Sequence, residues 1–240
     1  LGDLNLDNIL KLDEIDFVKK LTPVYKLVNL IKDNILTKNK NTIGFVGAPW
    51  TLLVYMINKK SPKSGLKSDF FKDEKLINKT LKIIEKFLKV HIKNQVDSGA
   101  QIIQIFDSWA GLLSEKDLPN YIYEPTINIV EYTKSLNVPV ICFPKGIKKF
   151  KDFCEIVKPS AICIDYEVDP KEILKDIQIP VQGGMDPKIL LTDQENLKKE
   201  VKKYLDIFKD HPYIFNLGHG ILPETDPKMM DYLVKMVKDH

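Results

Sequence analysis

The chain has 240 residues, of which 44% are hydrophobic and 29% charged, and its formal net charge at pH 7 is +3. This length can bury a large core, and the composition is ordinary for a globular domain. The charges are spread without a concentrated basic patch, and no apolar run reaches the roughly 18 residues of a membrane span, which argues against nucleic-acid and membrane partners.

The first residues and the cysteines indicate a reducing compartment. Residues 1–16 hold five acidic side chains and no long apolar stretch, so no signal peptide is predicted. Cys142, Cys154 and Cys163 lack metal-ligand spacing and are expected to be reduced, mostly buried thiols. We therefore expect a cytoplasmic protein, or an organellar one if the source is a parasite. The chain starts at Leu1 without methionine, so we expect its N-terminus to be cut, processed or missing.

Six short runs rich in β-branched and aromatic residues are predicted to be strands. They are "TIGFVG" (42–47), "QIIQIF" (101–106), "VPVICF" (138–143), "SAICID" (160–165), "IPVQGG" (179–184) and "YIFNLG" (213–218). Most are almost continuously apolar, which is typical of parallel strands covered on both faces.

Amphipathic stretches between these runs are predicted to be helices, at about 22–38, 68–98, 114–136, 147–157, 193–210 and 226–239. Thr22 is the expected N-cap of the first, with Pro23 at its first helical position. Gly99 is the expected stop of the second. A further helix is expected after "GAPW" (47–50).

Alternating strands and helices predict an α/β fold with a parallel sheet. No G-x-G-x-x-G follows an early strand, which argues against a dinucleotide-binding open sheet. Turn formers and polar groups instead follow the strands at their carboxyl ends, which is typical of the (β/α)8 TIM barrel. We predict a single domain over 1–240 that holds about six of the eight βα units, with the other two upstream.

His219 lies between Gly218 and Gly220, just past the last predicted strand. In a barrel its imidazole would project into the mouth, where it could donate a hydrogen bond to a polar or anionic substrate, or titrate near neutral pH. Two other interpretations stay open: a loop histidine that caps a neighbouring carbonyl, and a glycine-rich phosphate nest.

The segment "FDSWAG" (106–111) follows the second predicted strand. Ser108 could hydrogen-bond a ligand and Phe106 could line a cavity, whereas no nucleophile elbow is present. We interpret Asp107 as an N-cap or turn acceptor rather than a catalytic group. Trp109 and Tyr55 are each typical of packing when their spacing alone is considered.

Five segments together resemble successive signatures of uroporphyrinogen decarboxylases. They are "GFVGAPWTLLVYMI" (44–57), "QIFDSWAG" (104–111), "FPKG" (143–146), "VQGGMDP" (181–187) and "FNLGHGILPETDP" (215–227). They occur in the family's order, at about its spacings, over nearly the whole chain. The last of them is the most specific.

The resemblance implies a carboxy-lyase with a (β/α)8 barrel, without metal or organic cofactor and commonly a homodimer. Its reaction removes CO2 from the four acetate side chains of uroporphyrinogen III, giving coproporphyrinogen III in haem biosynthesis. It implies that Tyr55, Ser108 and His219 are catalytic and contact the substrate, and that Phe106 is an apolar substrate contact.

Two features depart from the family pattern. The chain has no arginine, and neither the family's N-terminal arginine-rich motif nor its early pyrrole-binding aspartate has a counterpart. At the fourth signature, Gly184 replaces the usual asparagine. We therefore interpret the chain as the C-terminal two-thirds of such a barrel and expect these 240 residues alone to be nearly inactive.

Two alternatives remain open. One is an inactive fragment or pseudoenzyme that keeps a dimer surface or a porphyrin-binding face. The other is a relative of the corrinoid or coenzyme M methyltransferases, which bind zinc through histidine and cysteine. No His-x-Cys pair occurs in the sequence, and His219 stands where a thiol would be expected, which disfavours the methyltransferases.

Overall fold

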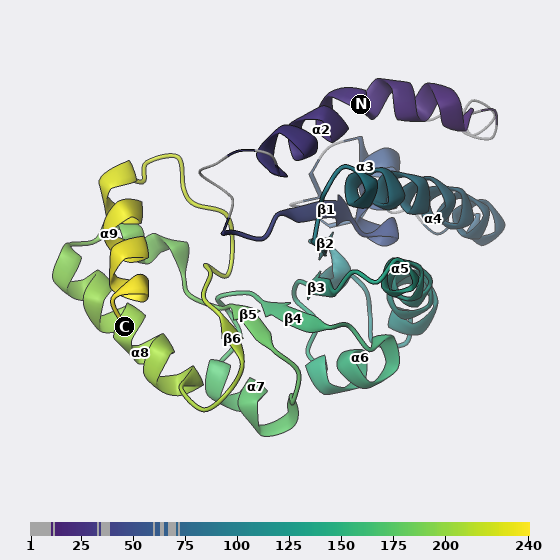
Figure 1. Ribbon diagram of the computed structural model, residues 1–240. Coiled ribbons are helices and arrows are strands. Elements are labelled where there is room, and N and C mark those ends of the chain that lie inside the picture. Colours follow the sequence, from purple (N-terminus) through teal and green to yellow (C-terminus); the bar gives the residue numbers. More distant parts are fainter. Residues whose placement is uncertain are drawn as a thin grey trace. The chain divides into compact units, whose positions relative to one another are not determined.

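The computed structural model describes residues 11, 13–32, 34, 39–59, 61–62, 65–66, 71 and 73–240. The chain divides into two compact units (Figure 1). The first comprises Leu1–Lys148 and Glu155–Pro159, and the second comprises Lys149–Cys154 and Ser160–His240. Helix α6 (Phe150–Val157) contributes residues to both. That all 240 residues form a single domain stays a prediction.

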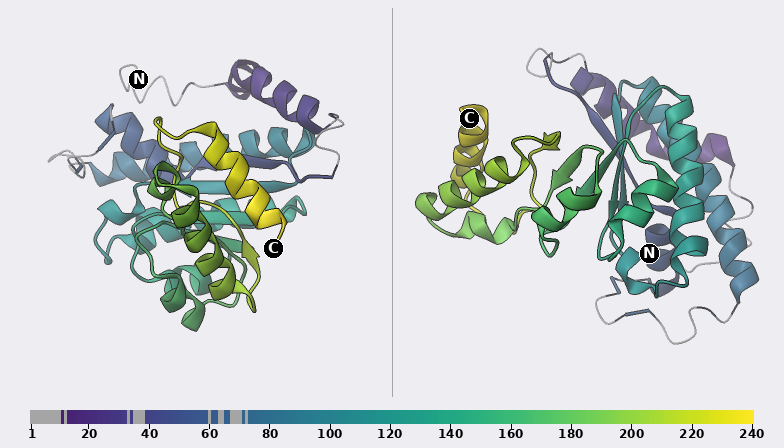
Figure 2. Two further views of the ribbon diagram at one scale, coloured as in Figure 1. Left: turned by 90° about the vertical axis from the view of Figure 1, so that its left-hand side faces the viewer. Right: turned by 90° about the horizontal axis from the view of Figure 1, so that it is seen from below.

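The first unit contains three parallel strands and their helices. These are α2 (Glu14–Lys32), β1 (Ile43–Gly47), α3 (Pro49–Asn58), α4 (Glu74–Asp97), β2 (Ile102–Asp107), the 3-10 turn η2 (Ala110–Leu112), the π-helical turn η3 (Pro119–Tyr123), α5 (Glu124–Ser135) and β3 (Val140–Pro144). Strand β2 lies between the other two, pairing Val46 with Ile105 and Phe106 with Phe143. Helices α4 and α5 lie side by side against these strands (Figure 2).

The second unit repeats the pattern with shorter elements. They are β4 (Ala161–Ile164), α7 (Pro170–Asp176), β5 (Val181–Gly183), the 3-10 turn η4 (Pro187–Leu191), α8 (Gln194–Phe208), β6 (Tyr213–Ile214) and α9 (Pro227–Lys238). Strand β5 pairs in parallel with both β4 and β6. Helices α8 and α9 pack side by side (Figure 1).

The predicted α/β fold with six parallel strands alternating with helices is confirmed, and each predicted run contains a strand. The last strand is shorter than predicted, because only Tyr213 and Ile214 form a continuous ladder with β5. Pairing resumes as an isolated bridge between Met185 and Leu217. Helix α7 was not among the predicted helices, because its seven residues are too few for a clear helical period.

The predicted start of the first helix is wrong. Helix α2 begins at Glu14, so Pro23 lies inside it and the Thr22 hydroxyl donates to the Val18 carbonyl instead of capping. The capping role falls to Asp13, whose carboxylate accepts from the Ile15 amide. A proline inside a helix removes one backbone hydrogen bond, and the packing of Tyr25 and Val28 supports the helix across it. Residues 35–38 of the predicted helix lie outside the described residues.

The other predicted helices agree better with the structure. Helix α4 begins after Asp73, whose side chain accepts from the Leu76 amide, and Gly99 follows its end at φ +115°, as the glycine stop predicted. Positions 68–70 and 72 of that predicted helix lie outside the described residues. The predicted helix at 114–136 begins as the π-helical turn η3 and continues as α5.

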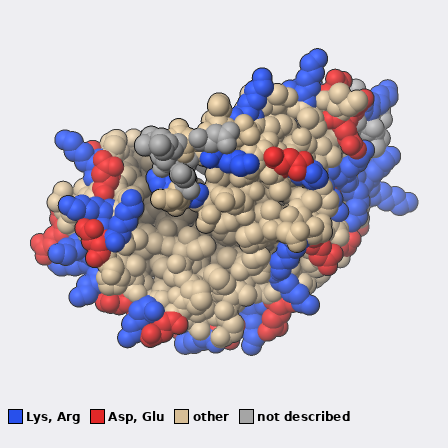
Figure 3. All heavy atoms as spheres, in the orientation of Figure 1, with Lys and Arg blue, Asp and Glu red and all other residues tan. Residues whose placement is uncertain are grey.

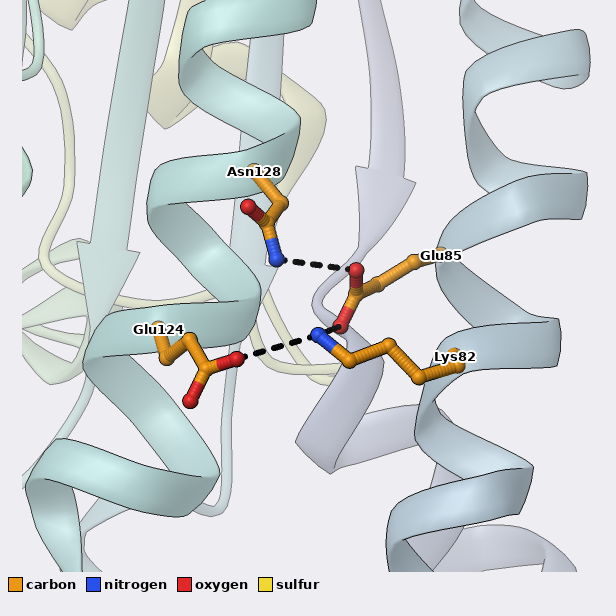
Figure 4. Close-up of polar contacts among 4 residues, drawn as sticks. All are labelled: Lys82, Glu85, Glu124 and Asn128. Carbon is orange, nitrogen blue, oxygen red and sulfur yellow. Dashed lines mark hydrogen bonds and ion pairs between the residues drawn. The ribbon is translucent and has the colours of Figure 1, made fainter.

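Polar side chains join α4 to α5 on the helical side of the first unit (Figure 4). Glu85 is 5% exposed and accepts hydrogen bonds from Asn128 at 3.0 Å and from Lys82 at 3.4 Å. Lys82 also binds Glu124 at 3.1 Å. Burial alone would lower the pKa of Lys82, but its hydrogen bond to Glu124 and the charge of Glu85 raise that pKa above its ordinary value.

We predict that Asn128→Ala lowers the free energy of unfolding by about 1–3 kcal/mol, because it leaves the buried Glu85 carboxylate without its shorter hydrogen bond. Lys93→Ala, which removes the exposed pair with Asp97, should cost less than about 0.5 kcal/mol. Urea denaturation of both variants measures the two values. Equal losses would show that Asn128 does not compensate the burial of Glu85.

Candidate active site

Helix α3 begins immediately where β1 ends. Ala48 has extended backbone angles, its amide donates to the Phe106 carbonyl at 2.8 Å, and Pro49 occupies the first helical position. Proline suits that position because its fixed φ is already helical and it has no amide to satisfy. The first turn of α3 is thereby held at the carboxyl end of β2, and the same helix carries Tyr55.

A buried hydrogen bond joins α3 to the end of β2. The Thr51 hydroxyl donates to Oδ1 of Asp107 at 2.7 Å, and both residues are about 4% exposed. The other oxygen, Oδ2, is buried with no hydrogen-bond partner. The carboxyl group therefore binds a helix side chain, and the prediction that Asp107 serves as an N-cap or turn acceptor is wrong.

The two tryptophans continue this contact. The Trp109 amide donates to the Thr51 hydroxyl at 3.3 Å, and Nε1 of Trp50 donates to the Trp109 carbonyl at 3.0 Å. The Tyr55 ring lies edge-on to the Trp109 ring, with centroids 6.0 Å apart. Tyr55 is therefore packed beside the segment that contains Ser108, and both side chains are half-buried.

Phe106 projects from the opposite face of β2. Successive strand residues point to opposite faces, so Phe106 faces away from the side on which Asp107 meets α3. Its ring lies 6.0 Å from the Phe45 ring and 6.0 Å from the Phe143 ring. These three aromatic rings form a row across β1, β2 and β3. That Phe106 contacts a substrate stays a prediction.

Glycines let the loops after β2 and β3 meet at their backbones. The Gly111 amide donates to the Lys145 carbonyl at 2.9 Å. A Cβ atom on Gly111 would lie 2.8 Å from the Gly146 carbonyl oxygen, closer than real side chains approach. The loop carrying Ser108 and Trp109 is thus held against the "FPKG" loop.

Burial dominates the electrostatics of Asp107. It raises the pKa of this carboxyl group from 3.8 to about 7, and the hydrogen bond from Thr51 offsets only part of the effect. The charged form is disfavoured because the group is buried and its Oδ2 receives no hydrogen bond from the protein. At neutral pH the group is therefore partly protonated.

We predict that burial of Asp107 makes stability depend on pH. Its pKa is higher in the folded chain than in the unfolded one, so its favourable contribution is complete below about pH 4 and declines as the pH rises to about 7. The free energy of unfolding of the native protein relative to Asp107→Asn should fall by about 4 kcal/mol over that range and then stay constant. Urea denaturation at successive pH values measures the difference; a constant difference from pH 4 to pH 8 would contradict the shift.

His219 lies in the second unit, in the loop that follows the Leu217 bridge. It is exposed, and its ring centroid is 6.4 Å from that of Tyr166. The Gly218 amide donates to the Met185 carbonyl at 2.8 Å. A Cβ atom on Gly218 would overlap the Tyr166 amide nitrogen and lie 2.8 Å from the Asp165 carbonyl carbon, whereas one on Gly220 would meet nothing within 4 Å. Only Gly218 is required by close backbone approach.

We predict opposite outcomes for the two glycines beside His219. Gly218→Ala should displace the loop from the end of β4 and lower the free energy of unfolding by about 1–3 kcal/mol, because its methyl group overlaps backbone atoms that have no room to move. Gly220→Ala should change stability by less than about 0.5 kcal/mol. Thermal denaturation of the two variants tests this, and a destabilised Gly220→Ala with an unaffected Gly218→Ala would overturn it.

Gly184, which stands where the family pattern usually has asparagine, lies in a tightly packed segment directly after β5. Gly183 and Gly184 both have positive φ, +86° and +97°. The Tyr204 hydroxyl donates to the Gly184 carbonyl at 2.6 Å, and burial raises the pKa of Tyr204 to about 12. A Cβ atom on Gly184 would lie 3.1 Å from both Ile164 and Tyr204, so a side chain there requires these neighbours to shift.

A second polar site lies outside the predicted one. A cavity of about 450 Å³ opens between α4 and the η3–α5 segment. Its lining combines acidic and amide side chains with Lys82, Tyr121 and two apolar residues. Within the described part of the chain, no three His, Cys, Asp or Glu side chains are grouped to hold a metal ion. Cys142, Cys154 and Cys163 form no disulfide.

The structure brings together part of the predicted site. Tyr55 packs beside the segment that contains Ser108, whereas Phe106 projects from the opposite face of β2. These three residues lie in the first unit and His219 in the second, so their meeting around one substrate stays a prediction. Sequence reasoning missed Thr51. The sequence places Thr51 in the first turn of a helix that directly follows a strand, which could have marked it as close to the candidate site. Its partner could not be predicted, because Asp107 is 56 residues away in the sequence.

Solved structures with a similar fold identify the class of protein. A methyltransferase from Methanosarcina mazei aligns with a TM-score of 0.71 and 18% identity over 90% of this chain and 63% of its own. A B12-independent methionine synthase from Shewanella sp. W3-18-1 aligns with a TM-score of 0.57 and 15% identity. These likenesses show the fold alone: the protein is of the parallel α/β class in which helices alternate with strands.

The family follows from sequence comparison. The family model "Uroporphyrinogen decarboxylase (URO-D)" matches residues 3–240, and the chain belongs to this family. Uroporphyrinogen decarboxylases from Rickettsia bellii and Wolbachia pipientis wMel are each 38% identical over 92% of this chain. One from Orientia tsutsugamushi (strain Ikeda) is 35% identical over 98% of it. The chain spans 66% of the length of the Rickettsia and Wolbachia relatives and 71% of the Orientia relative.

Proposed function

We propose that the protein is a carboxy-lyase that converts uroporphyrinogen III to coproporphyrinogen III by decarboxylating its four acetate side chains, without a cofactor. The observation that carries the proposal is the family match over residues 3–240, supported by relatives at 38% identity. We also propose a homodimer in the cytoplasm. Three cysteines without a disulfide support a reducing compartment. In the described residues no helix is long and apolar enough to cross a bilayer.

Decarboxylation requires that the pyrrole ring accept the electron pair of the carbon–carbon bond that breaks. Protonation of the pyrrole makes it a cation, and cleavage of the bond between the acetate CH2 and its carboxylate releases CO2 while the bonding electrons move into the ring. A proton then adds to the CH2 carbon, the ring loses the first proton, and a methyl group remains. The protein contributes by positioning the acetate and stabilising the cation, and such preorganised stabilisation is commonly the largest part of catalysis.

Three accessible side chains are the proposed polar contacts. His219 donates a hydrogen bond to a substrate carboxylate, and its exposure in the loop after Leu217 supports this role. Tyr55 and Ser108 are both half-buried. The Tyr55 ring packs on Trp109, the residue that follows Ser108 in the sequence. Such placement suits side chains that reach a substrate while their backbones stay fixed. Phe106 supplies an apolar surface for the macrocycle, as one member of the aromatic row.

Recognition of the substrate's carboxylates by cations of this chain depends on lysine, because none of the 240 residues is arginine. Lysine binds a carboxylate as a point charge without the bidentate geometry of a guanidinium group. Lysine and acidic side chains are interspersed around the face shown in Figure 3. Along the sequence the charges are spread without a concentrated basic cluster, which favours a small-molecule substrate over a nucleic acid.

We predict that His219→Ala and Tyr55→Phe each lower kcat/KM for uroporphyrinogen III at least about tenfold, or cause partly decarboxylated porphyrinogens to accumulate, because each removes one substrate hydrogen bond. The measurement is anaerobic incubation of the full gene product, followed by chromatography of the oxidised porphyrins. His240→Ala and Tyr132→Phe are matched controls, because they make the same changes outside the proposed site. His240 is exposed, and the Tyr132 ring on α5 lies beneath the Lys89 ammonium group of α4.

Three outcomes separate the alternatives. No turnover by the full gene product would overturn the decarboxylase, and retained uroporphyrinogen binding in that case would indicate a non-catalytic relative. Stoichiometric zinc in the purified protein would favour methyltransferase chemistry. Native kinetics in both His219→Ala and Tyr55→Phe would remove these residues from the site.

A further inference from the structure

One hydroxyl group binds both neighbours of Ser108. The Thr51 hydroxyl donates its hydrogen to the Asp107 carboxyl group at 2.7 Å and accepts the Trp109 amide at 3.3 Å. Asp107 and Trp109 flank Ser108 in the sequence. The Asp107 side chain and the Trp109 backbone amide, on either side of Ser108, are therefore bound to the same atom of α3.

The same side chain is connected to Tyr55. Thr51 precedes Tyr55 by four residues, which places the two one turn apart on the same helix. The Tyr55 ring returns to contact the Trp109 ring. A displacement of Thr51 relative to Asp107 would therefore move Tyr55 and Ser108 with respect to one another.

We propose that Thr51 is a positioning residue whose hydroxyl, anchored on the Asp107 carboxyl group, sets the relative placement of Ser108 and Tyr55. The roles of Ser108 and Tyr55 toward substrate rest on the function proposed above. Thr51 acts through these two side chains and lies on the helix-facing side of β2, away from the aromatic row that contains Phe106.

The contact differs from those of other buried threonines. The hydroxyls of Thr80 and Thr133 donate to carbonyls four residues earlier in their own helices, so each bond stays within one helix. The Thr51 hydroxyl instead reaches the end of a strand whose acceptor is 56 residues distant. Asp107 receives no other side-chain hydrogen bond within the described ranges, since its Oδ2 is unpartnered.

Three variants separate positioning from general packing. Thr51→Val removes the hydroxyl and keeps the shape, Thr51→Ser restores the hydroxyl, and Thr133→Val is the matched control on α5. Amide hydrogen exchange at Trp109, measured by NMR without substrate, should accelerate at least about tenfold in Thr51→Val, because its acceptor is lost. It should stay within about threefold of the native rate in the other two. If Thr51→Val does not fold, Thr51→Ala takes its place.

The kinetic measurement uses uroporphyrinogen III and the same proteins. Thr51→Val should lower kcat/KM about 10- to 100-fold, and Thr51→Ser and Thr133→Val should remain within about threefold, since misplacement of contact groups by about 1 Å costs up to that range. Native exchange at Trp109 in Thr51→Val overturns the proposal. So does accelerated exchange with native kinetics, because the hydroxyl would then be only structural. If the full gene product without substitutions lacks turnover, the decarboxylase proposal fails, and the exchange result alone decides whether Thr51 holds the segment.

Discussion

The first unit depends on one buried hydrogen bond between a helix and a strand. Thr51 and Asp107 are almost fully buried, and between them they join the first turn of α3 to the last residue of β2. A buried acceptor without its donor costs far more than an exposed one, so this bond specifies one placement of helix against strand. The segment that follows, with Ser108 and Trp109, takes its position from that placement.

The same burial that gives specificity creates an unusual carboxyl group. Asp107 has one satisfied oxygen and one without a partner, and the resulting pKa of about 7 lies far above that of an exposed aspartate. Perturbed groups of this kind cluster at functional sites, although ion-pair networks also produce them. Here no charged neighbour contributes to the shift, so its cause is the burial of the carboxyl group.

Elsewhere the chain satisfies buried polar groups with side chains from its helices. Phe45 lies on β1, at the edge of the three strands of the first unit, and its side chain is 63% exposed. The buried amide of Gln95 on α4 both donates to the Phe45 carbonyl and accepts from its amide, each at 3.1 Å. Glu85 is satisfied in the same way by Asn128 and Lys82. Each such group would otherwise oppose folding, because buried donors and acceptors without partners are costly.

The sequence by itself determined the class of fold and the location of the candidate residues. Continuously apolar runs separated by helical periods predict parallel strands, and "FDSWAG" and "NLGHG" follow the second and last of these runs. Local rules failed at α2, where packing of Tyr25 and Val28 carries the helix through Pro23. Only the tertiary structure decided that Asp107 is buried against Thr51 and that Gly218, unlike Gly220, is required. The physical reason is that both depend on atoms brought close by folding from distant parts of the sequence, and no local pattern encodes such a distance.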